Sequence, residues 1–141
     1  MAITLSTWSF ETSSGLVGIG VDSEKVHRFD NLQGNDQHPL PFVFSKKEVV
    51  HNRTLTRPAT GFCMCFCCKE AVLKAVGGPY NFSECEIFPT PQKEHTFSPI
   101  EISMSEKFKK DHGVGTGVCV FDKNSLNDEE IIAVVYLFRD L

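Results

Sequence analysis

The chain divides into a first part with helical spacing of its apolar residues and a second part in which apolar and polar residues alternate. The clearest helical signal is segment 61–78, whose apolar residues recur every three or four positions and which closes on a pair of glycines. Within this segment Phe66, Glu70 and Lys74 follow one another at four-residue spacing. They therefore share one face of the predicted helix, one turn apart.

Shorter elements precede this helix. The run Val17–Asp22 is apolar except for its final acid, which predicts a buried strand that delivers a carboxylate at its end. Residues 23–32 again show helical spacing, so Asp22 is alternatively the cap of a helix that follows it. Further along, Ser45 and Glu48 form the pattern of a capping box, which predicts the start of another helix.

Beyond residue 78 the pattern becomes alternating and rich in turn-forming residues. The predicted strands are 85–88, 100–103, 117–121 and 131–138. The lysine-rich stretch 107–113 between them is expected to form a hairpin. Helices early and strands late predict an α+β domain with a largely antiparallel sheet, in which either of the last two segments is the final strand.

Composition narrows the class of protein. With 141 residues, 41% of them hydrophobic and 23% charged, the chain is expected to form a single domain, 1–141, in which the Ser/Thr-rich segment 1–14 is an edge strand or a loose arm. The absence of a long apolar run or a leader pattern predicts a cytoplasmic protein with no membrane association. A formal charge of −4 argues against a nucleic-acid binder, which needs a basic face.

Four of the six cysteines crowd into the motif Cys63-x-Cys65-x-Cys67-Cys68. This spacing suits neither a disulfide framework nor a zinc finger. We therefore expect these cysteines to be small buried apolar residues in a reducing compartment. A thiolate metal site or redox site is the alternative.

Two motifs together carry a family resemblance. A Gly-[Ile/Val]-x-x-Asp strand end at Gly18–Asp22 is followed, after about forty residues, by an aromatic-x-x-Lys-Glu-Ala-x-x-Lys helix at Phe66–Lys74. This pair resembles the 4'-phosphopantetheinyl transferase superfamily, and the short chain is similar to its small bacterial branch, the holo-acyl-carrier-protein synthases. The stretch Phe44–Glu48 also resembles the family's Phe-Thr-x-x-Glu element. The implied fold packs helices on a mostly antiparallel sheet.

The resemblance implies a reaction and a cofactor. A serine hydroxyl of an acyl carrier protein attacks the pyrophosphate of coenzyme A, takes over the phosphopantetheine arm and releases adenosine 3',5'-bisphosphate. Asp22 and Glu70 are then the expected ligands of magnesium, which prefers oxygen donors. Lys74 and Lys69 are expected to reach phosphate oxygens. Either Glu70 or a water on the magnesium accepts the serine proton, and the sequence leaves both open.

Further implied sites lie outside the two motifs. Gly77 and Ser103 are expected to contact the coenzyme, and Arg28 and Arg57 the carrier protein. The basic stretch 46–57 fits this expectation, because acyl carrier proteins are strongly acidic. The resemblance also implies a homotrimer with active sites between subunits, acting in fatty acid, other lipid, polyketide or another biosynthesis.

The chain departs from the family pattern at two notable positions. Met104 stands where family members usually carry a histidine, and Cys65 where the small branch often carries an arginine. His112 or Lys107 from the nearby stretch would be candidates to replace the missing histidine. The alternative function is a degenerate, non-catalytic homologue that binds coenzyme A or docks a carrier protein.

Overall fold

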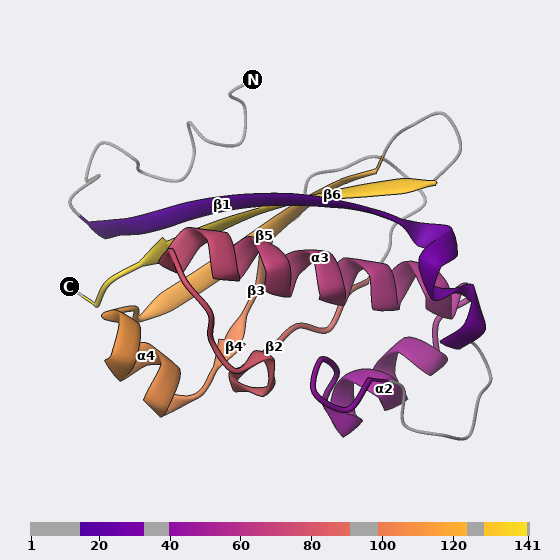
Figure 1. The fold of residues 1–141 in the computed structure, drawn as a ribbon, viewed down its shortest axis with the longest axis horizontal. Helices are drawn as coiled ribbons and strands as arrows, with labels where there is room; N and C mark the ends of the chain where they lie inside the picture. The colour runs from indigo at the N-terminus through magenta and orange to yellow at the C-terminus, as the bar shows by residue number, and fades with distance from the viewer. Residues whose placement is uncertain (1–14, 33–39, 91–98, 124–128, 141) are drawn as a thin grey trace.

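The structure is a computed structural model, and it describes residues 15–32, 40–90, 99–123 and 129–140. Helices and antiparallel sheets are combined in one fold, which confirms the predicted α+β class (Figure 1). The expected edge strand or loose arm at 1–14 falls outside the described residues. In the described ranges, no helix is long and apolar enough to cross a membrane.

The main sheet has four strands in the order β1-β6-β5-β3, and all neighbours are antiparallel. Its strands are β1 (Leu16–Lys25), β6 (Glu130–Phe138), β5 (Thr116–Lys123) and β3 (Ile100–Glu101). A second sheet pairs β2 (Cys85–Glu86) with β4 (Ser103–Met104). The chain's last strand is therefore β6, and it lies between β1 and β5.

The helices are α2 (Lys46–Arg53), α3 (Pro58–Val76) and α4 (Glu106–His112), with 3₁₀ turns η2 (Val26–Leu32) and η3 (Phe82–Glu84). The predicted capping box is confirmed, since Ser45 and Glu48 exchange side-chain to backbone hydrogen bonds at the start of α2. The long helix is also confirmed. It begins three residues earlier than expected, at a proline that suits the first helical turn, and it ends at Gly77 in the left-handed conformation.

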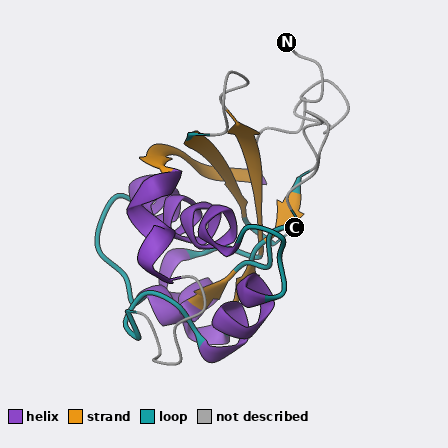
Figure 2. Ribbon diagram, turned by 90° about the vertical axis from the view of Figure 1, so that its right-hand side faces the viewer, coloured by secondary structure: helices purple, strands orange, loops and turns teal. Residues whose placement is uncertain are grey.

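Helix α3 lies against one face of the main sheet, directly beside β1 (Figures 1 and 2). The contact depends on glycines in the strand. A Cβ atom on Gly18 would lie 2.3 Å from the carbonyl oxygen of Ala75, and one on Gly20 would lie 1.8 Å from that of Ala71. Because neither glycine has a side chain, the backbones of strand and helix approach more closely than any other residue would allow.

Two predictions about the first strand are wrong. The strand is not buried on both faces, because Val17, Ile19 and Val21 are 40%, 50% and 49% exposed on the side away from α3. Nor does it end at Asp22, since β1 continues to Lys25 and is followed by a 3₁₀ turn rather than an α-helix. Pairing with β6 over the whole length keeps the strand extended, so Asp22 lies inside the strand and caps no helix.

The predicted hairpin at 107–113 is also wrong, because these residues belong to helix α4. The Ser105 hydroxyl accepts a hydrogen bond from the Phe108 amide, and Gly113 ends the helix in the left-handed conformation. Phe108 is buried, while the lysines face solvent. One buried residue in a charged stretch gave too weak a helical period to recognise.

Candidate active site

The site is built where β1 and α3 run antiparallel. Beyond the two glycine contacts, Cys67 donates its thiol hydrogen to the carbonyl oxygen of Asp22 at 3.1 Å. Each step of two residues along the strand thus matches a step of four residues back along the helix, because both cover about 6 to 7 Å. This match carries Asp22 to the part of α3 from which Glu70 and Lys74 project.

Asp22 and Lys74 form an ion pair in which Nζ donates to Oδ1 at 3.0 Å. The Asp22 side chain is 11% exposed and that of Lys74 is 53% exposed. Asp22 Oδ2 is buried and has no hydrogen-bond partner among the described residues. A buried carboxylate oxygen without a partner is costly, which indicates that this atom is available to a ligand.

The charges of Asp22 and Lys74 also act on the carboxyl group of Glu70. Partial burial raises its pKa above the usual range, and the negative charges of Asp22 and Glu24 raise it further. The pKa of the Lys74 ammonium is also raised, chiefly by its hydrogen bond to Asp22. The structure therefore brings together all three residues that the sequence placed at the centre of the site.

Glu24 is a neighbour that sequence reasoning missed. Its carboxylate pairs with Arg28, whose guanidinium lies 5.9 Å from the ring centre of Phe29 and 5.7 Å from that of Phe66. Residues two apart in a strand share a face, so Glu24 was in principle recognisable as a companion of Asp22. The prediction that the strand ends at Asp22 concealed it.

The donor set fits magnesium. Asp22 and Glu70 supply carboxylate oxygens, one of them the unpartnered Oδ2. In the part of the chain that is described, no three His, Cys, Asp or Glu side chains gather as a complete metal cage. Magnesium commonly takes only one or two carboxylates, with waters and substrate phosphates completing its shell.

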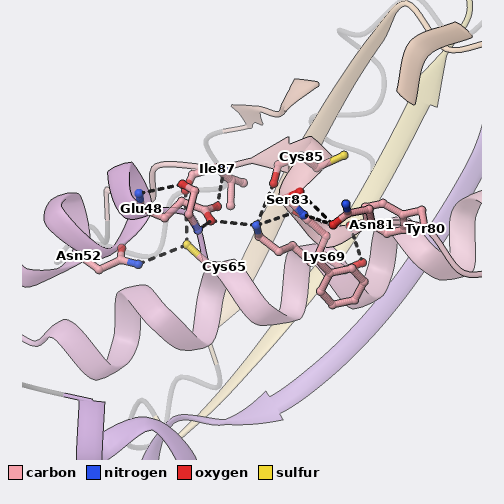
Figure 3. Close-up of polar contacts among 11 residues, drawn as sticks. Glu48, Asn52, Cys65, Lys69, Tyr80, Asn81, Ser83, Cys85 and Ile87 are labelled. Carbon is pink, nitrogen blue, oxygen red and sulfur yellow. Dashed lines mark hydrogen bonds and ion pairs between the residues drawn. The ribbon is translucent and has the colours of Figure 1, made fainter. Parts of the chain in front are cut away.

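Lys69 does not join this group, although it precedes Glu70 in the sequence. Its side chain is 1% exposed, and its ammonium donates to Glu48 Oε1 at 2.8 Å, to the Cys85 carbonyl at 2.8 Å and to the Phe82 carbonyl at 3.1 Å (Figure 3). An ammonium has three hydrogens to donate. The expectation that Lys69 binds a coenzyme phosphate does not fit this position, because all three donors are used inside the protein.

The remaining predicted coenzyme contacts are exposed. Gly77 ends α3, and a Cβ atom there would meet nothing within 4 Å. Ser103 on β4 lines a hollow of about 360 Å³ together with Met104 and Lys109. Met104 is partly buried and packs against the core.

The two suggested replacements for the missing histidine have other partners. Lys107 pairs with Asp111 at 2.5 Å, and the ring of His112 lies 4.6 Å from that of Phe108. Neither lines the hollow beside Ser103. The structure thus gives no support to either as a substitute.

The two arginines predicted to contact the carrier protein pair with different acidic residues. Arg28 belongs to η2 and contacts Glu24, while Arg57 immediately precedes α3 and approaches Asp30 at 3.9 Å. Both arginine side chains are about half exposed, at 53% and 46%. Their guanidinium groups therefore remain accessible to a partner.

All six cysteines are buried and free, which confirms the prediction that they act as small apolar residues. Burial raises the pKa of Cys63 and of Cys85 to about 12, and raises the pKa of Cys65, Cys67 and Cys68 as well. Such thiols stay protonated near neutral pH, and the thiolate is the reactive form.

Comparison with solved structures finds the same fold in holo-acyl-carrier-protein synthases. The holo-ACP-synthase from Plasmodium yoelii matches with a TM-score of 0.64 and 18% identity over 89% of this chain and 97% of that one. The synthase from Neisseria meningitidis matches with a TM-score of 0.65 and 18% identity over 86% and 98%. The Chronobacterium ammoniagenes ACPS-CoA complex matches with a TM-score of 0.57 and 20% identity over 88% and 98%.

Comparison of the sequence itself gives a family match and no match to a curated protein. The family model ACPS, described as the 4'-phosphopantetheinyl transferase superfamily, matches residues 18–130. This range contains both motifs and most of the chain, so the protein belongs to the 4'-phosphopantetheinyl transferase superfamily.

Proposed function

We propose that the protein moves the 4'-phosphopantetheine arm of coenzyme A to a serine of an acyl carrier protein, with magnesium, and releases adenosine 3',5'-bisphosphate. The observation that carries this proposal is the unpartnered, buried Oδ2 of Asp22, a residue that pairs with Lys74 and whose charge raises the pKa of Glu70. We also propose that the whole chain, 1–141, forms a single transferase domain.

Asp22 and Glu70 would hold the magnesium ion, which offsets the charge of the coenzyme pyrophosphate when bound. The two ligands come from β1 and α3, whose glycine-mediated contact keeps them together. In the absence of the cation, the Asp22 and Glu24 charges raise the Glu70 pKa. A bound cation would favour the ionised carboxylate instead.

Lys74 and Glu70 supply the remaining chemistry of the chain. Lys74 Nζ uses one hydrogen on Asp22 Oδ1, and the Lys74 side chain is about half exposed, so the ammonium has donors left for a phosphate oxygen of the leaving group. The Glu70 carboxylate is one candidate to accept the serine proton, because it lies on the same helix face as Lys74, one turn before it. A water in the site is the other.

Coenzyme A is the proposed substrate. The similar fold of the Chronobacterium ammoniagenes ACPS-CoA complex supports it, as does the exposure of the predicted contacts Gly77 and Ser103. The adenosine bisphosphate part would leave from the same surface once the phosphodiester to the serine has formed.

Arg28 and Arg57 are the proposed contacts of the acidic carrier protein. Helix α2 supports a basic docking side, because Glu48 is 0% exposed while Lys46 and Lys47 face solvent. The acid of this helix therefore does not neutralise its outer face. That face also exposes Val50 by 67%.

We further propose a homotrimer acting in the cytoplasm. An edge strand that exposes Val17, Ile19 and Val21 supports association of subunits, since apolar edges are otherwise prone to aggregation. Six free cysteines support a reducing compartment. Sedimentation should show a trimer, and Ile19→Lys should dissociate it; a wild-type monomer would contradict the proposed assembly.

The test of function is intact-mass analysis of apo-acyl carrier proteins incubated with this protein, coenzyme A and magnesium. We expect one carrier to gain one phosphopantetheine, and Asp22→Ala to lose this activity because it removes the unpartnered oxygen. Lys110→Met is a matched control on exposed helix α4 and should behave as wild type. A mass gain that is the same with Asp22→Ala would contradict the proposed site.

Met104 favours a second candidate function, a non-catalytic homologue that binds coenzyme A or docks a carrier. The residue places a thioether beside Ser103, where the family usually has an imidazole. Calorimetry that detects coenzyme A binding, with no mass gain on any carrier, would establish this function. A gain restored by Met104→His would then identify the residue that was lost.

A further inference from the structure

Lys69 and Glu48 join three segments of the chain at a buried point. Besides binding Lys69, Glu48 accepts the amide hydrogen of Ser45 on Oε1 and that of Ile87 on Oε2, each at 2.9 Å (Figure 3). The pair therefore fastens helix α2 and helix α3 to the stretch 82–87. Both side chains are almost completely buried, at 1% and 0% exposure.

Stability alone does not account for such a pair. Burying two charges costs about as much as their attraction returns, and apolar residues of similar volume are often as stable. An apolar pair, however, would bind neither the carbonyl oxygens of Phe82 and Cys85 nor the amide of Ile87. The charged pair therefore fixes positions that simple packing would leave free.

The Lys69–Glu48 pair first fixes how α3 is rotated about its own axis. Lys69 and Glu70 are consecutive on this helix, so their side chains are held about 100° apart. Tyr80 adds a second tie, because its hydroxyl donates to the carbonyl oxygen of Lys69 at 3.0 Å. With Lys69 anchored on the side of α2, Glu70 is directed toward β1 and Asp22.

The second position is that of β4. Lys69 holds the carbonyl of Cys85, and in the small sheet Cys85 lies opposite Met104 and Glu86 opposite Ser103. The amide of Ser105 closes this sheet by donating to the carbonyl of Glu84 at 2.8 Å. One buried ammonium thus connects the helix of Glu70 to the strand of Ser103.

We propose that Lys69 and Glu48 are positioning residues that align Glu70 and Ser103, and that Lys69 contacts no substrate. The kinetic consequence of this inference rests on the proposed transferase function. The structural consequence does not.

The kinetic test compares Lys69→Met, Glu48→Gln and the double variant, with Lys110→Met as control. We expect kcat to fall by about ten- to 100-fold in each, with the KM for coenzyme A changed by less than about threefold. Because the two residues act together, the double variant should be no slower than the slower single variant. It also leaves no unpaired buried charge, so it remains informative where a single variant fails to fold.

Two kinetic outcomes would overturn the proposal. If Lys69→Met raises the KM for coenzyme A while Glu48→Gln leaves both constants unchanged, Lys69 binds the substrate directly. If all three variants melt at lower temperature but keep kcat, the pair is only structural.

Amide hydrogen exchange separates this proposal from the proposed function. In the double variant, without coenzyme, the Ser105 amide should exchange at least about tenfold faster than in wild type, while the Gly77 amide at the end of α3 serves as reference. A wild-type protein that modifies no carrier would contradict the transferase function and leave this measurement decisive. Unchanged protection of Ser105 would then overturn the positioning role.

Discussion

Two lysines of α3, five residues apart, form ion pairs of nearly equal length in opposite surroundings. Lys69 lies 2.8 Å from Glu48 with both side chains almost fully buried, whereas Lys74 lies 3.0 Å from Asp22 and is 53% exposed. In the first pair every ammonium hydrogen has an internal acceptor. In the second, one carboxylate oxygen has none among the described residues.

The comparison teaches that the length of an ion pair does not define its role. What distinguishes the two pairs is whether the surrounding backbone satisfies them. Carbonyl oxygens from 82–85 accept hydrogen bonds from the Lys69 ammonium, while β1 and α3 leave Asp22 Oδ2 without a hydrogen-bond partner among the described residues. One face of the helix therefore holds the fold together, and another is available for chemistry.

The largest expected effect is on stability and tests the closed side. Lys69→Met should lower the free energy of unfolding by about 3 to 5 kcal/mol, because it leaves the buried Glu48 carboxylate without its counter-ion, bound only by the amides of Ser45 and Ile87. Lys74→Met should lower it by less, about 1 kcal/mol, because water reaches the half-exposed Lys74 side of this pair. Urea denaturation of both variants measures the difference, and equal losses would break the comparison.

The next effect is on activity and tests the open side. Asp22→Asn should slow transfer by at least about 100-fold, because an amide retains an acceptor for Lys74 but is a poorer magnesium ligand than a carboxylate. The urea midpoint should stay close to that of wild type. Initial rates over a range of magnesium concentrations provide the measurement, and a rate unaffected by the substitution would remove Asp22 from the metal site.

A third prediction concerns the contact that brings the open side together. Gly20→Ala should destabilise the fold by about 1 to 3 kcal/mol or more, because its Cβ would lie 1.8 Å from the Ala71 carbonyl oxygen and would force strand and helix apart. Gly78→Ala is the matched control, since its Cβ would meet nothing within 4 Å. Should thermal melting show the same loss for both, the close packing of β1 on α3 would not be the cause.

The smallest effect is a pH dependence at Glu70. Its pKa is raised in the folded protein, so ionisation of this carboxyl opposes folding. The contribution of protonated Glu70 to the stability of the fold is complete below the pKa of the unfolded chain, about 4.3. It is lost as pH rises through the pKa of the folded protein.

Glu70→Gln should therefore gain stability relative to wild type as pH rises from about 4 upward, by less than about 1 kcal/mol because solvent screens the site. Urea titrations without metal at several pH values measure this trend. A variant that instead loses relative stability as pH rises would show that the Glu70 carboxylate is stabilised in the fold.

The sequence predicted elements whose signal is local. The helix predicted from about 61 and observed at Pro58–Val76, its glycine end and the capping box at Ser45 all depend on residues within a few positions of one another. That Asp22, Glu70 and Lys74 belong to one site was also predicted, but through the family resemblance, since the strand and the helix are far apart in the chain.

The tertiary structure decided what depends on distant neighbours. Lys69 and Lys74 look equivalent in the sequence, and only the packing of α2 and the stretch 82–87 around α3 makes one of them structural. The same holds for β1, whose partner β6 lies more than a hundred residues away and keeps the strand extended beyond Asp22. The sequence alone determined which residues carry charge and which elements have a strong local signal; burial, set by long-range packing, decided which charges face a ligand.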